Sequence, residues 1–197
     1  MKNFVRLVSA TALAAVCLVG CGEDDGDGGS YGFVEIDGLK WMKKNLNIET
    51  ADSWCYENSA DSCKKYGRLY TWDAAKTACP SGWRLPSRSE WVTLAKAAGG
   101  TGYYGVDGTA GKKLKAASRW NENGNGTDGF GFSALPGGYR NTGGGFEGTG
   151  IIGNWWTATE YGSGNAYYRY MTYNNDGVLE YDYVTGYGRS VRCVKDE

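Results

Sequence analysis

The chain has 197 residues, of which 41% are hydrophobic and 22% charged, and 21 basic residues nearly balance 22 acidic ones to a net charge of −1. This length corresponds to one domain, and the even charge balance argues against nucleic-acid binding. The chain contains no histidine, which excludes the commonest general base and the Ser/His and Cys/His nucleophile pairs.

The first twenty residues predict a lipoprotein signal peptide. Lys2 and Arg6 precede an apolar segment, residues 7–19, which is typical of a secretion signal. This segment has about 13 residues, whereas a helix needs about 20 to cross a bilayer. It ends in "LVGC", which resembles the lipobox of bacterial lipoproteins and implies cleavage before Cys21 and acylation of that cysteine. An ordinary signal with an unmodified cysteine is the alternative.

Residues 22–30, "GEDDGDGGS", predict an extended tether between the lipidated Cys21 and the folded domain. The segment has four acids and no apolar residue to bury, so it lacks the means to form a core. It also resembles the acidic signals that send some lipoproteins to the outer face of the outer membrane, and a cation site is the competing interpretation. The folded domain is then expected over residues 31–197.

Four cysteines remain in the predicted mature domain once Cys17 leaves with the signal and Cys21 is acylated. An even number in an exported protein predicts two disulfides, with three possible pairings. We favour Cys55–Cys63, which closes a short loop, and Cys79–Cys193, which joins the early helical region to the last strand. A zinc site competes with this interpretation, but the chain has no C-x-x-C pair and no histidine.

The first half of the domain predicts one hairpin and two helices. Residues 33–36 and 39–43 alternate around Asp37-Gly38, a hairpin signal. A first helix is expected over residues 71–78. The segment 79–91, "CPSGWRLPSRSEW", contains Ser87 followed three residues later by Glu90, the spacing of a capping box that starts a second helix. We therefore interpret this dense segment as a structural corner and not as a catalytic one.

Residues 99–165 are rich in glycine and have no lasting periodicity, so they predict a long loop region. Large apolar residues are spread through it, which predicts a compact arrangement. Residues 154–159, 166–173 and 178–184 then predict strands, the last two joined by a turn at residues 174–177, and residues 189–194 a closing strand. The whole pattern is of the α+β class.

The succession of "GWRLPSRSEW", "GFSALPGGYR", "NWWTAT" and "SVRCVKD" resembles the Fibrobacter succinogenes major paralogous domain, a family of exported bacterial proteins. More remotely, the Arg-Leu-Pro segment followed by Glu-Trp is similar to the sulfatase-modifying-factor family, and the order of elements is similar to C-type-lectin-like domains. The lectin resemblance implies a small antiparallel sheet that brings both ends of the domain together, and a ligand site in the long loop region. The Cys79–Cys193 pairing matches the long disulfide of such domains.

Catalysis and metal binding find little support in the residues. Formylglycine-generating enzymes need two reactive thiols near the C-terminal end, and only Cys193 lies beyond Cys79. A catalytic pair of carboxylates among Glu147, Glu160 and Glu180 is an alternative that the sequence leaves open. Residues 121–132 resemble a calcium-binding EF-hand loop, but the twelfth position is Phe132, where a bidentate Glu is needed. We therefore interpret the segment as a turn rich in glycine and asparagine, with a weak calcium site using Glu122 or Asp128 as the alternative. We expect no cofactor and no enzymatic activity.

The aromatic residues provide the candidate binding site. The chain has 15 Tyr and 8 Trp, and such rings suit both sugar faces and protein partners. The segment 155–168 concentrates them, and the candidate ligand-binding residues are Trp155, Trp156, Glu160, Tyr161 and Asn165. Alternation predicts that Trp155 and Trp156 face opposite ways, so the one that points outward is the better candidate.

These expectations combine into a lipid-anchored, surface-exposed lipoprotein of the outer membrane that binds polysaccharide or a surface protein without catalysis. A structural or protein-interaction envelope lipoprotein without a small ligand is the first alternative. A diverged enzyme of the formylglycine-generating type is the second.

Overall fold

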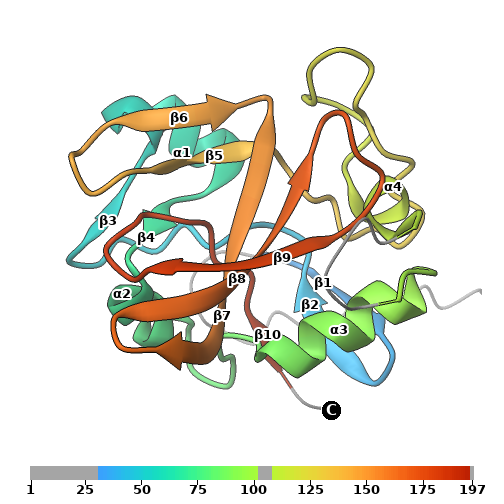
Figure 1. Cartoon of the computed structure of the whole chain (residues 1–197), viewed down its shortest axis with the longest axis horizontal. Coiled ribbons are helices and arrows are strands. Elements are labelled where there is room, and N and C mark those ends of the chain that lie inside the picture. Colours follow the sequence, from blue (N-terminus) through green and yellow to red (C-terminus); the bar gives the residue numbers. More distant parts are fainter. Residues whose placement is uncertain (1–30, 102–107, 196–197) are drawn as a thin grey trace, which may run out of the picture.

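The computed structural model describes residues 31–101 and 108–195. The predicted signal peptide, Cys21 and the tether lie outside these residues. The described chain is mixed α+β (Figure 1). Its strands are β1 (Phe33–Ile36), β2 (Leu39–Met42), β3 (Ser53–Trp54), β4 (Leu69–Tyr70), β5 (Gly137–Arg140), β6 (Phe146–Thr149), β7 (Ile152–Gly162), β8 (Asn165–Thr172), β9 (Leu179–Val184) and β10 (Val194–Lys195). Its helices are the 3-10 helix η1 (Tyr56–Asn58), α1 (Ala60–Tyr66), α2 (Trp72–Ala78), α3 (Arg88–Ala97) and α4 (Ala110–Leu114).

The first hairpin forms as predicted. β1 and β2 pair antiparallel, and the turn residues Asp37 and Gly38 both have positive φ, 51° and 76°, the backbone geometry that tight hairpin turns require. β2 also pairs with β10, so Trp41 lies opposite Val194. The two ends of the described domain therefore meet in one three-stranded sheet, ordered β1-β2-β10.

The larger sheet has five strands in the order β6-β5-β7-β8-β9. Figure 1 shows β7 and β8 running through the middle of the molecule, with α1 beside β5 and β6 at one end and α3 beside β10 at the other. The β7–β8 and β8–β9 pairs are antiparallel, with a bulge in β7 between Trp156 and Glu160. β8 pairs with β7 on one side and β9 on the other, so hydrogen bonds fix its backbone. Its side chains project from the two faces of the sheet.

Two apolar clusters form the core on either side of β7. The first contains Trp41, Trp91, Phe132 and Trp155 among its members, with ring centroids of Trp41 and Trp91 5.1 Å apart. The second contains Met42, Tyr70, Trp72, Trp156 and Cys193 among its members. Successive residues of a strand point to opposite faces, and Trp155 and Trp156 therefore belong to different clusters.

Both predicted helices begin where their capping residues place them. The Thr71 side chain accepts a hydrogen bond from the backbone N–H of Ala74 at the start of α2. At α3, Ser87 and Glu90 form the predicted capping box. Glu90 also pairs with Arg84 at 2.6 Å, and the backbone of Arg84 bridges to Val194 of β10. The segment 79–91 is therefore a structural corner, as expected.

Both favoured disulfides are present. Cys55–Cys63 closes a loop with a sequence separation of 8, and Cys79–Cys193 spans a separation of 114. Cys193 is completely buried in the second cluster, so the long disulfide ties the end of α2 to the last strand through the core. This confirms the pairing among the three that the sequence left open.

The predicted long loop region is partly wrong. Residues 99–165 contain α4, β5, β6 and the whole of β7. Glycines remove the side-chain alternation by which strands are recognised. At Gly138 of β5, where φ is +69°, a Cβ atom would clash with the carbonyl oxygen of Glu147. No apolar alternation develops where side chains have no room. Helix α1 was not predicted either.

The predicted closing strand over residues 189–194 is regular only at its end. Its first residues make isolated bridges to several elements in turn, with Arg189 opposite Tyr70 and Ser190 opposite Trp155. Pairing with a different partner at each step prevents a continuous ladder. Within the described ranges, no helix is long and apolar enough to cross a membrane.

Candidate functional site

A group of six tyrosines covers one face of the five-stranded sheet. The register places Tyr168 of β8 opposite Tyr181 of β9, and Ala166 opposite Tyr183. Side chains alternate along a strand, so tyrosines two residues apart share a face. Tyr139 of β5 and Tyr187 of the segment after β9 join them through ring contacts. We call this set the tyrosine face: Tyr139, Tyr168, Tyr170, Tyr181, Tyr183 and Tyr187.

The rings of the tyrosine face contact one another in two connected groups. Tyr183 packs edge-on against Tyr187 at 4.7 Å between centroids, and Tyr187 stacks on Tyr139 at 6.0 Å. Tyr168 contacts Tyr170 at 5.7 Å and Tyr181 at 6.5 Å. Tyr181 is 53% exposed and Tyr183 40% exposed, whereas the other four are partly buried. The face therefore offers aromatic surface to solvent on a rigid base.

Arg189 lies beneath the tyrosine face and joins its two groups. Its guanidinium carbon lies 3.5 Å from the ring centroid of Tyr168 and within 6.0 Å of those of Tyr139, Tyr183 and Tyr187. Reciprocal backbone hydrogen bonds with Tyr70, 2.8 and 2.9 Å long, hold the arginine in place. The side chain of Arg189 is only 4% exposed.

Aromatic ring faces surround the charge of Arg189. Within residues 31–101 and 108–195, Arg189 makes no ion pair. Burial lowers the pKa of Arg189 to about 10, and the surrounding tyrosines oppose this shift. It therefore remains a cation at neutral pH, and its cation–π contacts stabilise the arrangement of the rings.

A fixed carboxylate marks one edge of the tyrosine face. The Tyr139 hydroxyl donates to Glu147 at 2.8 Å, and the Asn141 amide donates to the other carboxylate oxygen at 2.9 Å. These hydrogen bonds lower the pKa of Glu147. Burial, together with the hydrogen bond to Glu147, raises the pKa of Tyr139 to about 12. At neutral pH the edge therefore presents an ionised acceptor beside a protonated phenol.

The two tryptophans that the sequence singled out are not part of any exposed surface. Trp155 and Trp156 do face opposite ways, as predicted, but both are fully buried. The indole N–H of Trp155 donates to Asn45 at 2.9 Å, and that of Trp156 donates to the Tyr70 carbonyl at 2.8 Å. The expectation that one of them points outward is wrong, because β7 is covered on both faces.

The other predicted residues lie at the end of the β7–β8 hairpin. Glu160 and Tyr161 are exposed, and the Asn165 amide donates to Asp182 at 3.1 Å. Tyr161 contacts Tyr167 at 5.2 Å, which alternation places on the sheet face opposite Tyr168. The structure thus brings Tyr161 to the far side of the sheet, away from the tyrosine face.

An open cavity of about 360 Å³ lies near this hairpin, lined by Arg88, Ser89, Val92 and Thr159. The guanidinium of Arg88 binds both carboxylate oxygens of Glu180, the shortest contact being 2.7 Å. Glu180 also pairs with Arg169, and the side chains of both are fully buried. Of the three acids considered for a carboxylate pair, Glu180 is therefore held in a buried ion network.

The calcium-like loop is built around internal hydrogen bonds. The Asp128 carboxylate accepts from the backbone N–H of Ser133 at 2.7 Å and from its hydroxyl at 2.5 Å. The Asn125 side-chain oxygen accepts a hydrogen bond from the backbone N–H of Trp120 at 3.0 Å. Within the described part of the chain, no group of three or more His, Cys, Asp or Glu is arranged to hold a metal ion.

The comparisons with known proteins identify the family. Residues 34–195 match the Fibrobacter succinogenes major domain, and the chain belongs to this family. No curated protein and no solved structure matches. The predicted family resemblance is confirmed, and the remote likeness to C-type-lectin-like domains is not.

Sequence reasoning missed all six residues of the tyrosine face and Arg189. Four of the tyrosines carried a usable signal, because the spacing of residues 168, 170, 181 and 183 places them on one face of a hairpin. Arg189 carried none. Its position depends on isolated bridges between segments far apart in the sequence.

Proposed function

We propose that this member of the Fibrobacter succinogenes major domain family is a non-catalytic binding module, anchored to the cell envelope by lipid on Cys21, whose tyrosine face binds polysaccharide. The observation that carries the proposal is the exposed pair Tyr181 and Tyr183, which belong to a cluster of tyrosine rings packed around the buried Arg189 guanidinium. The anchor and the surface location are supported by the lipobox-like "LVGC" and the acidic tether.

Sugar rings are suitable partners for this surface for two physical reasons. Their apolar C–H faces pack on flat aromatic rings, and their hydroxyl groups need hydrogen-bond partners at the rim. Phenol hydroxyls and the Glu147 carboxylate, which Tyr139 and Asn141 hold in place, supply such partners. The ring-to-ring contacts fix the side chains before binding, which reduces the conformational entropy lost on association.

The proposal extends to the fold. A C-type-lectin-like arrangement is supported by the pairing of β2 with β10, which brings both ends of the domain into one sheet. The long Cys79–Cys193 disulfide is a second supporting feature. An experimental structure whose strand order differs from β1-β2-β10 and β6-β5-β7-β8-β9 would refute this part.

Retention on insoluble polysaccharide tests the binding function. Purified mature protein is incubated with cellulose and with xylan, and the variants Tyr181→Ala and Tyr183→Ala are compared with wild type. Tyr161→Ala is the matched control, because Tyr161 is 56% exposed but lies on the other side of the sheet. Loss of one stacking ring is expected to weaken binding by about 1 kcal/mol, about fivefold in affinity, and the control is expected to bind normally.

The outcomes separate the alternatives. Retention no greater than that of an unrelated protein on both materials would exclude the polysaccharide and favour a protein-interaction role. Release of new reducing ends during incubation would contradict the non-catalytic role and indicate a glycoside hydrolase. Free thiols in the unreduced mature protein would favour the thiol chemistry of the formylglycine-generating type. The anchor is tested separately by mass analysis of the membrane-extracted protein, where an acyl-modified Cys21 is expected and a free Cys21 thiol would contradict the proposal.

A further inference from the structure

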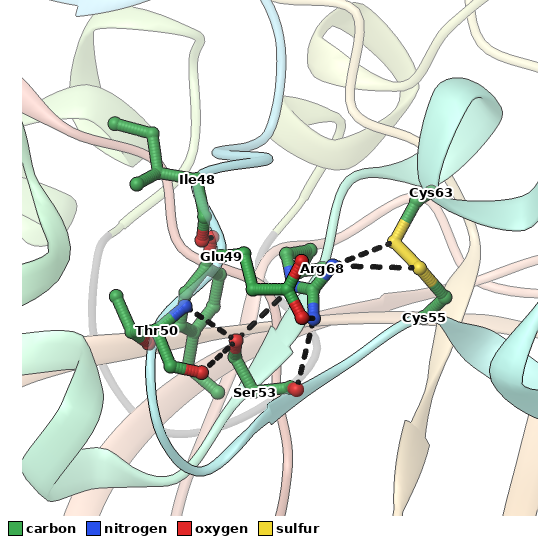
Figure 2. Close-up of a disulfide and its surroundings, with 8 residues drawn as sticks. Ile48, Glu49, Thr50, Ser53, Cys55, Cys63 and Arg68 are labelled. Atoms are coloured by element: carbon green, nitrogen blue, oxygen red, sulfur yellow. Dashed lines mark hydrogen bonds and ion pairs between the residues drawn. A yellow bond between two sulfur atoms is a disulfide. The ribbon is translucent and has the colours of Figure 1, made fainter. Parts of the chain in front are cut away.

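The Cys55–Cys63 disulfide lies against a positively charged side chain. Figure 2 shows the Arg68 guanidinium beside both sulfurs. Its Nη1 lies 3.7 Å from the Cys55 sulfur and 3.9 Å from the Cys63 sulfur. Helix α1 carries Cys63, whereas Cys55 precedes η1 and Arg68 precedes β4, so three separate segments converge at this point.

Arg68 is held in this position by a network of hydrogen bonds. Its Nε donates to the Ser53 hydroxyl and its Nη2 to the Ser53 carbonyl, both at 3.1 Å. The Ser53 hydroxyl is itself fixed, because it donates to the Thr50 carbonyl at 2.8 Å and accepts from the Thr50 N–H at 3.0 Å. The Arg68 side chain is only 12% exposed, so its charge is poorly screened by solvent.

One exposed carboxylate opposes this charge. Glu49 lies 3.1 Å from Arg68 Nη2, and its side chain is 80% exposed. An exposed partner neutralises a partly buried charge only weakly. The sulfurs therefore lie beside a cation that its exposed partner neutralises only in part.

Among the residues that the structure describes, no charged side chain lies within hydrogen-bond reach of the Cys79 or Cys193 sulfur. Cys193 is fully buried in the second core cluster. Opening Cys55–Cys63 would free only a short loop around η1 and α1, whose ends are eight residues apart in the sequence. Opening Cys79–Cys193 would disturb the core.

A nearby guanidinium favours the thiolate form of cysteine, and a better thiolate is a better leaving group in disulfide exchange. We propose that Cys55–Cys63 is a thiol–disulfide exchange site that reacts with dithiols, and that Arg68 makes it more reducible than Cys79–Cys193. This inference is independent of the polysaccharide proposal.

The exchange proceeds in two balanced steps. A thiolate of the dithiol attacks the Cys55 sulfur, because Cys55 is half-buried whereas Cys63 is 6% exposed. The S–S bond breaks, Cys63 leaves as a thiolate beside Arg68, and Cys55 carries a mixed disulfide. The second thiol of the dithiol then attacks the sulfur that the dithiol contributes to the mixed disulfide, and Cys55 leaves as a thiolate. The dithiol loses two electrons and two protons and becomes a cyclic disulfide, and the cystine gains them as two thiols.

Timed reduction of the oxidised mature protein with dithiothreitol tests the proposal. Samples are quenched with an alkylating agent, and each cysteine peptide is quantified by mass spectrometry, with Cys79–Cys193 as the internal reference. We expect Cys55 and Cys63 to become alkylated about tenfold faster than Cys79 and Cys193. Near-UV circular dichroism is expected to keep its native tryptophan signal after the first disulfide opens.

Two variants with opposite predicted effects isolate the role of the charge. Arg68→Gln removes the cation and should slow reduction of Cys55–Cys63 about tenfold, and Glu49→Gln removes the opposing charge and should accelerate it about twofold. Because Glu49 is exposed, its variant tests the proposal even if Arg68→Gln fails to fold. Equal reduction rates for the two disulfides, or a Glu49→Gln rate at or below wild type, would overturn the proposal.

Discussion

Removal of the long disulfide should destabilise the domain far more than removal of the short one. The perturbation is the double variant Cys79→Ala/Cys193→Ala, compared with Cys55→Ala/Cys63→Ala. Alanine leaves no free thiol to form new pairings. Both variants remove the same chemical bond, so the difference between them reports how each constrains the unfolded chain.

The magnitude follows from the loop lengths. A cross-link reduces the conformational entropy of the unfolded chain. The reduction grows with the logarithm of the number of residues in the loop that the cross-link closes. With a separation of 114, Cys79–Cys193 should contribute about 5 kcal/mol, and with a separation of 8, Cys55–Cys63 about 2.5 kcal/mol. Cys193 is also fully buried, so its truncation adds a small loss of packing.

Urea unfolding followed by tryptophan fluorescence, without reductant, measures both losses. The account predicts that the midpoint of Cys79→Ala/Cys193→Ala falls about twice as far as that of the other double variant. Equal losses, or a larger loss for Cys55→Ala/Cys63→Ala, would refute the reasoning that the long disulfide secures the fold.

Two further predictions concern the stability of the scaffold. Burial alone would raise the pKa of Glu90, but hydrogen bonds from Arg84 and Ser87 bring it below its ordinary value of 4.5. The folded state therefore gains stability from ionised Glu90 above pH 4.5 and loses it as the pH falls through the lowered pKa. Glu90→Gln should be about 1 kcal/mol less stable than wild type at pH 7. Urea unfolding should show this difference in the free energy of unfolding disappear at pH 3. A difference that does not change with pH would contradict the capping-box role. Arg192, fully buried, donates to Asn45 and to the carbonyls of Met42 and Phe132, so Arg192→Met should cost about 3 kcal/mol in urea unfolding, and a loss below 1 kcal/mol would contradict it.

Local chemistry made part of the fold predictable. The Asp37-Gly38 turn and the Ser87/Glu90 capping box each depend on residues a few positions apart, and both form as expected. The β5 strand escaped prediction because its glycines remove the side-chain alternation by which strands are recognised. Its geometry is decided by close approach of other backbone segments, such as that of Glu147 to Gly138.

The candidate site was harder to predict than the fold. Alternation correctly separates Trp155 from Trp156, but it gives no information on which sheet face is covered, and β7 is covered on both. Tyr168 and Tyr181 had the spacing of a shared face. Arg189, which holds that face together, is positioned by contacts with Tyr70 that span more than half of the domain, and short-range patterns do not record such contacts.

Chemical nitration of tyrosines, with and without soluble xylan, tests the central claim most directly. Mass spectrometry quantifies nitration at each tyrosine of the folded protein. The account predicts that xylan protects Tyr181 and Tyr183 from nitration. It leaves Tyr161, which is more exposed than either and lies on the other side of the sheet, unchanged. Protection of Tyr161 in place of Tyr181 and Tyr183, or xylan binding with no protection of either, would contradict the assignment of the tyrosine face as the binding surface.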